Sequence, residues 1–206
     1  MSSREFILER VRRNQPAWRA LPPVPSFERP VIDPLAAFGA ALARMGGALA
    51  EAQPGASLDE FIGARFPEAR VICSAVPEVQ GTRRIQSVRH AAELDDVDVG
   101  VVRAVFGIAE TGSVWLSERE LVVNALGFLA QHLVVLLDPQ AIVPDLHRAY
   151  LHPGFFDARY AVLMTGPSAT ADIEGVLIRG AQGIRTLTVI PVAAPAAALV
   201  NARRTA

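Results

Sequence analysis

The stretch AVLMTGPSATADIEGVLIRGAQG, residues 161–183, carries most of the information about the fold. Its short apolar start, residues 161–164, predicts a buried strand, which Gly166 and Pro167 bring to an end. A helix is predicted to follow, with four residues on one face: Ile173, Val176, Leu177 and Gly180. The segment is therefore predicted to form a strand, a tight turn and a helix, the unit from which α/β folds are built.

The start of this predicted helix is a candidate anion site. Ser168 or Thr170 can cap the helix, and Asp172 in its first turn suits the positive end of the helix dipole. The free amide groups of such an end bind phosphate or carboxylate. Most strand–turn–helix units bind nothing, so a purely structural turn is the alternative.

A second candidate is the turn in GIAETGS, residues 107–113. Glu110 follows an apolar run, where a carboxylate can face a ligand at the end of a strand. Thr111 and Ser113 add hydroxyl groups, and Gly112 lets a ligand approach the backbone. Glu110 is the candidate catalytic residue. The alternative is that its carboxylate accepts hydrogen bonds from a neighbouring turn and holds two loops together.

The rest of the chain alternates between strand and helix patterns. Apolar runs at 99–108 and 113–116 are predicted as antiparallel strands on either side of the Glu110 turn. Further strands are predicted at 69–74, 133–137 and 187–192, and helices at 34–50, from Ser57, and at 143–151. This alternation predicts a layered α/β fold.

Both motifs resemble those of the lactate-utilisation (LUD) domain family, in particular its LutC/YkgG-like members. TGPSATADIEGVLIRGAQG is similar to the family's C-terminal signature, and Ala109-Glu110-Thr111-Gly112 to its Ala-Glu-Thr-Gly turn. The resemblance covers the chain from about residue 70 onward, and the first 60 residues match loosely. It implies the three-layer α/β sandwich shared by ribose-phosphate isomerases, glucosamine-phosphate deaminases and coenzyme A transferases.

The chain is expected to consist of two parts. Residues 1–34 are predicted to form an N-terminal helix, with Phe6, Ile7 and Val11 on one side, followed by a connector rich in proline. Trp18 and Phe27 suggest that the connector packs on a surface, either of its own chain or of a neighbour. Residues 35–206 are predicted to form the LUD-type α/β domain, with a frayed tail from Ala193.

Composition excludes several classes of chemistry. The 206 residues carry a net charge of −1, which gives no reason to expect nucleic acid binding. All 20 basic residues are arginine, and the absence of lysine excludes a Schiff base, a pyridoxal phosphate anchor and a Walker-type P-loop. Cys73 is the single cysteine, so this chain by itself holds no disulfide, iron–sulfur cluster or Cys-rich zinc site.

Neither a metal site, a dinucleotide site nor a membrane span is expected. His147 and His152 are poorly spaced for shared ligation, and His132 beside Gln131 could reach a pocket or lie on the surface. Gly-x-Gly-x-x-Gly is absent. The apolar region at 121–137 is too short and too polar to span a membrane, and the start of the chain lacks a signal peptide. We expect a cytoplasmic protein.

The resemblance implies a protein that contributes to L-lactate oxidation, with iron–sulfur clusters in partner subunits only. We expect a small anionic ligand between the Glu110 turn and the loop at 165–170, because polar turns at strand ends share a crevice in α/β sheets. The predicted ligand-binding residues are Thr111, Gly112, Ser113, Thr165, Gly166, Pro167, Ser168, Thr170 and Asp172. The alternatives are a stand-alone isomerase- or coenzyme A transferase-like enzyme that uses Glu110 as base or nucleophile, and a non-catalytic assembly subunit. An oligomer is compatible with each.

Overall fold

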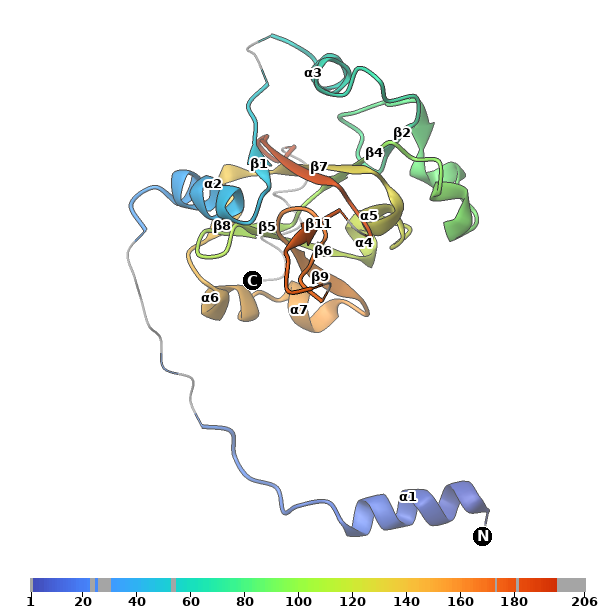
Figure 1. Ribbon diagram of the computed structural model, residues 1–206. Helices are drawn as coiled ribbons and strands as arrows, with labels where there is room; N and C mark the ends of the chain where they lie inside the picture. Colours follow the sequence, from blue (N-terminus) through green and yellow to red (C-terminus); the bar gives the residue numbers. More distant parts are fainter. Residues whose placement is uncertain are drawn as a thin grey trace.

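The computed structural model describes residues 2–22, 25, 31–52, 55–172, 174–180 and 182–195. Its α/β body is built on a six-stranded parallel sheet in the order β1-β12-β7-β4-β2-β3 (Figure 1). The strands of this sheet are β1 (Ala48–Leu49), β2 (Ile72–Ser74), β3 (Arg83–Arg84), β4 (Val99–Arg103), β7 (His132–Leu137) and β12 (Thr186–Pro191). The predicted α/β class is confirmed.

A second sheet of four strands, in the order β8-β5-β6-β9, packs against the first. Its strands are β5 (Phe106–Ile108), β6 (Ser113–Ser117), β8 (Ile142–Val143) and β9 (Ala161–Met164). The helices are α1 (Ser3–Arg13), α2 (Pro34–Arg44), α3 (Leu58–Arg65), α4 (Glu118–Leu121), α5 (Leu126–Leu129), α6 (Leu146–Tyr150) and α7 (Gly154–Asp157), and the 3-10 turns are η1 (Ile85–Ser87), η2 (Ala91–Leu94) and η3 (Pro139–Ala141).

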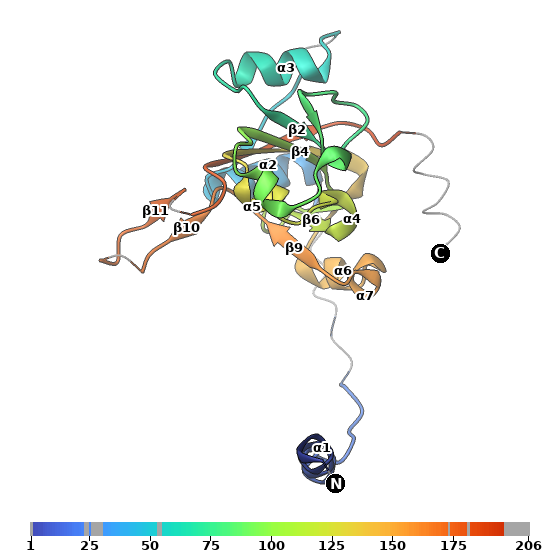
Figure 2. The same cartoon turned by 90° about the vertical axis from the view of Figure 1, so that its right-hand side faces the viewer.

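Alternation of side chains along β7 explains the layers. Leu133, Val135 and Leu137 point into the core shared with α2 and the second sheet, whereas Val134 and Leu136 point into the core beneath α3. Because residues 133–137 of β7 are buried on both faces, their sequence is a continuous apolar run. A third apolar cluster lies on the outer face of the second sheet, where α6 and α7 cover it (Figure 2).

The predicted single strand at 99–108 is two strands in different sheets. The Ala104 N–H group donates to Leu136 O of the first sheet (2.9 Å), and the next N–H group, of Val105, donates to Trp115 O of the second (3.2 Å). The chain therefore crosses between sheets within two residues. The antiparallel pair on either side of the Glu110 turn is confirmed, with β5 and β6 in register at Gly107 and Val114.

The predicted helix after Ser168 is wrong. Residues 168–172 and 174–180 form a hairpin in which β10 (Ala169–Thr170) pairs with β11 (Ile178–Arg179). Backbone conformation explains this result: Glu174, Gly175 and Gly180 have φ angles of 55°, 70° and 70°. The left-handed region interrupts a right-handed helix, and glycines in a helix interior are costly. The apolar periodicity of the sequence is therefore misleading here.

The N-terminal helix α1 is confirmed, and none of its residues is buried. It stands away from the body at the end of the connector (Figures 1 and 2). Trp18 is 87% exposed, so its predicted packing on a surface of the same chain is wrong. Phe27 and the tail at 196–206 lie outside the described residues. Within the described ranges, no helix combines the length and the apolar character needed to cross a bilayer.

Cys73 offers a direct test of this core. The thiol lies fully buried in β2, and burial raises its pKa, with a smaller opposing effect of Arg83. We predict that a thiol reagent labels the folded protein at least about a hundredfold more slowly than the protein in denaturant, because labelling requires opening of the sheet. Mass spectrometry over time measures both rates. Rapid labelling in native buffer would contradict the placement of β2 in the core.

Candidate functional site

The two turns singled out from the sequence meet at the C-terminal end of α2. Thr165 Oγ1 donates to the carbonyl oxygen of Thr111 (3.3 Å), so the turns touch. Gly112 has a φ angle of 67°, and a Cβ atom there would overlap the backbone of Leu42. Gly166 has a φ angle of 65°, and its Cβ atom would overlap the carbonyl group of Met45. Both glycines therefore allow close backbone packing.

The hydroxyl groups of the first turn are used within the turn. Thr111 Oγ1 donates to Ser113 Oγ (2.8 Å) and accepts from the Ser113 N–H group (3.3 Å). Ser113 is buried, and Pro167 is buried beside α2. These residues stabilise the junction of the two turns with α2.

The predicted anion site at residues 168–172 loses its physical basis, because no helix begins there. The Ser168 N–H group donates to Ile184 O (2.9 Å), and Ala169 and Thr170 pair with β11. Thr170 Oγ1 accepts from the Asp172 N–H group (3.3 Å), and Asp172 is exposed on the hairpin rather than turned toward a pocket.

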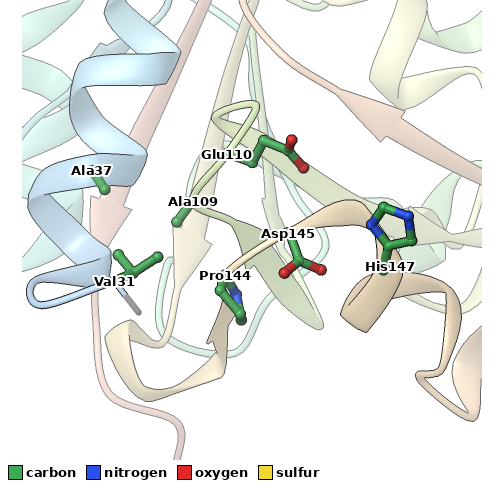
Figure 3. A pocket seen from close by; sticks show the side chains of 7 residues that line it. All are labelled: Val31, Ala37, Ala109, Glu110, Pro144, Asp145 and His147. Carbon is green, nitrogen blue, oxygen red and sulfur yellow. The ribbon is translucent and has the colours of Figure 1, made fainter. Parts of the chain in front are cut away.

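A pocket of about 370 Å³ lies at the carboxyl ends of the parallel strands β5 and β8. Its described lining consists of Val31, Ala37, Ala109, Glu110, Pro144, Asp145 and His147 (Figure 3). Apolar side chains lie on the α2 side, and the carboxylates and the imidazole lie opposite. The volume is within the range of small-molecule sites. Of the predicted site residues, Glu110 lines this pocket.

Glu110 joins the β5–β6 turn to the start of α6. Its Oε2 atom accepts from the Leu146 N–H group (3.1 Å), and its own N–H group donates to Pro144 O (3.1 Å). Asp145 caps the same helix by accepting from the Arg148 N–H group (2.8 Å). Helix amide groups thus stabilise two neighbouring carboxylates at one wall of the pocket. Glu110 therefore holds two loops together, which is the structural alternative given for it above. Its side chain is also exposed to the pocket.

Sequence reasoning missed Asp145 and His147 as pocket residues. Asp145-Leu146-His147 directly follows a strand, β8, of only two residues, which gives no periodic signal. One signal in the sequence could have found them: Asp145 is a possible N-cap of a helix, and His147 follows it two residues later. The parallel pairing of β8 with β5 brings this segment beside Glu110.

The carboxyl edge of the six-stranded sheet is occupied by protein side chains. Arg103 at the end of β4 donates from Nη2 and Nε to Glu78 Oε1 (2.7 and 3.1 Å), and from Nη1 to Val192 O (3.0 Å). Arg84 at the end of β3 donates to two carbonyl groups of the loop at 75–81 (2.6 and 2.8 Å). At this edge, where open α/β sheets commonly bind ligands, two arginines thus bind the loop at 75–81 beside the ends of β3 and β4.

The histidine that the sequence offered as a possible pocket residue, His132, lies elsewhere. His132 begins β7, where its ring packs 4.8 Å from that of Phe66 and its Nδ1 atom is 2.8 Å from Thr186 Oγ1. Burial lowers its pKa, as does Arg185, against an opposing effect of Asp98. Among the described residues, no group of three or more His, Cys, Asp or Glu side chains is placed to hold a metal ion.

We predict that Gly112→Ala lowers the free energy of unfolding by about 2–4 kcal/mol, because it adds both a strained φ angle and an overlap with α2. Gly55→Ala is the matched control: Gly55 also has a positive φ angle, of 87°, but its Cβ atom would meet open space. The control is expected to cost about 1 kcal/mol. Urea unfolding measures both. Equal losses would contradict the close packing at the junction.

Comparison with known proteins supports the fold. The sequence profile of the LUD domain matches residues 82–192. The crystal structure of a DUF162 family protein from Deinococcus radiodurans is similar to this chain, with a TM-score of 0.59 and 21% identity; the match covers 77% of this chain and 96% of that protein. No curated protein matches the chain significantly. Because the matched profile covers more than half of the sequence, this chain belongs to the LUD-domain family.

Proposed function

We propose that the protein is a cytoplasmic lactate-utilisation subunit of the LutC type. It would bind a small hydroxy acid in the pocket beside Glu110 and contribute to L-lactate oxidation with iron–sulfur partner proteins. The observation that carries this proposal is the membership of the LUD-domain family together with the position of the family's Ala-Glu-Thr-Gly turn at the pocket. We also infer that the body has the layered architecture of ribose-phosphate isomerases and coenzyme A transferases.

The chemistry of the pocket fits L-lactate. The hydroxyl group of lactate can donate to the Glu110 carboxylate, its carboxylate can accept from the His147 imidazole, and its methyl group can lie against Ala37 on the apolar side. Amide groups of α6 stabilise Glu110 and Asp145, which reduces their repulsion of an anionic ligand. In this proposal Glu110 would also accept the proton of the ligand hydroxyl.

Oxidation of lactate to the 2-oxo acid releases two electrons and two protons, one proton from the hydroxyl group and one from Cα. The protons would pass to Glu110 and to solvent. The electrons need an acceptor, and one buried cysteine cannot hold an iron–sulfur cluster by itself. The proposed acceptors are clusters in partner subunits. A stable complex with Cys-rich proteins encoded beside this chain would support this part of the proposal.

The second candidate function is an isomerase- or coenzyme A transferase-like enzyme. Two features favour it: Glu110, Asp145 and His147 line one pocket, and this pocket is larger than a three-carbon acid requires. A carboxylate and an imidazole in one pocket are groups that catalyse proton transfer. Glu110 would then act as base or nucleophile.

We predict that L-lactate raises the melting temperature of the purified chain, whereas inorganic phosphate and coenzyme A do not. In Glu110→Gln, the affinity for L-lactate should fall at least about tenfold, because the charged hydrogen-bond acceptor is lost. The free energy of unfolding should change by less than about 1 kcal/mol, since the amide oxygen still accepts from Leu146. Calorimetric titration and urea unfolding measure the two effects.

Glu118→Gln is the matched control, because Glu118 also accepts backbone N–H groups, from Arg159 and Tyr160, but is not part of the described pocket lining. It should bind L-lactate as the unmodified chain does. Unchanged affinity in Glu110→Gln would refute the proposed site. Stabilisation by coenzyme A alone would favour a transferase, and no stabilisation by any of the three compounds would favour an assembly role.

A further inference from the structure

The hairpin of β10 and β11 projects from the body (Figure 2). We call residues 168–172 and 174–180 the arm. Its two strands pair with one another and belong to neither larger sheet. The loop that joins them carries Val176 and Leu177, which are 60% and 58% exposed. An isolated two-stranded hairpin is marginally stable in water, so burial of the apolar side chains at its tip against a partner would stabilise it.

The base of the arm is firmly held. The Gly180 N–H group donates to Ser168 O, Ser168 Oγ donates to Gln182 O, and the Ser168 N–H group donates to Ile184 O. The arm thus leaves the body in a defined direction. The strands β10 and β11 are paired with one another up to the start of the tip loop, which distinguishes the arm from an unpaired loop.

Exposed apolar side chains also flank the base of the arm. Met45 lies beside Gly166, and the backbone of Phe128 lies beside Gly183. The residues Met45, Phe128 and Leu129 are 51%, 40% and 40% exposed. We call these three residues the base patch. These residues lie at the ends of α2 and α5, and the hairpin projects from this side of the body (Figure 2).

Charges are distributed along the arm in a self-complementary way. Asp172 and Glu174 are exposed in the tip loop, whereas Arg179 and Arg185 are exposed on the base side. Two identical arms that run in opposite directions would place each acidic tip against a basic base. The same arrangement would place Val176 and Leu177 against the base patch of the partner. A two-fold interface requires this kind of self-complementarity.

We propose that two copies of this chain form a two-fold dimer in which each arm lies across the base patch of the other copy. The apolar tips supply the binding energy, and the opposite charges fix the antiparallel orientation of the arms. Two arms in the same direction would bring like charges together. The partner is a second copy, because the complementary halves are both on this chain.

The first experiment is sedimentation velocity of the full chain over a concentration series. We expect a dimer, and we expect the double variant Val176→Asp/Leu177→Asp to raise the dissociation constant at least about a hundredfold. The control is Leu151→Asp/Phe156→Asp, which changes two side chains that are 72% and 80% exposed on another surface. It should remain dimeric. Circular dichroism verifies that each variant is folded; the substituted positions are exposed.

The second experiment exchanges the charges. Asp172→Arg/Glu174→Arg makes the tip basic, and Arg179→Glu/Arg185→Glu makes the base acidic. Each variant alone should dimerise weakly, and an equimolar mixture should form the heterodimer, which native mass spectrometry identifies. A monomeric unmodified chain, a dimer that persists in the tip variant, or a mixture without heterodimer would each overturn the proposal. Binding of the arm to a different protein by a monomeric chain would overturn it too.

Discussion

Close backbone packing at the C-terminal end of α2 is the constraint on which the arrangement of this protein depends. The Glu110 turn and the turn before the hairpin both reach this helix end through glycines, Gly112 and Gly166, that leave no room for a side chain. This junction fixes the second sheet against the first and makes α2 one wall of the pocket. Gly112 and Gly166 therefore serve packing, and Ala109 and Glu110 are the motif residues that line the pocket.

The pocket lies at the second sheet rather than at the six-stranded sheet. In the six-stranded sheet, Arg103 and Arg84 bind the loop at 75–81 beside the carboxyl ends of β4 and β3. The second sheet has its own parallel pair, β5 and β8, and the carboxyl ends of this pair remain open to the pocket. The combination of an apolar wall with carboxylates and an imidazole suits a small ligand that carries both a methyl and a hydroxyl group. This chemistry agrees with the lactate-related function proposed from the family.

Long buried strands are predictable because their apolar runs are local signals, as at 133–137 in β7. The prediction of one strand at 99–108 fails because the change of sheet at Ala104 and Val105 keeps the run apolar. The prediction of a helix in place of the hairpin fails because it relied on the spacing of the apolar residues. The glycines at 175 and 180 have positive φ angles, which oppose a helix. Glu110 is found through its turn, but its neighbours Asp145 and His147 follow a strand of two residues, and only the pairing of β8 with β5 brings them together.

The most direct test of the proposed site is a crystal structure of the chain grown with L-lactate. We predict density for the ligand at the carboxyl ends of β5 and β8, with its hydroxyl group within hydrogen-bonding distance of the Glu110 carboxylate and its methyl group toward Ala37. The α2 junction should be unchanged, because the pocket is formed without the ligand. Lactate bound instead at the turn of residues 165–170, or at the carboxyl edge of the six-stranded sheet, would contradict the proposed site.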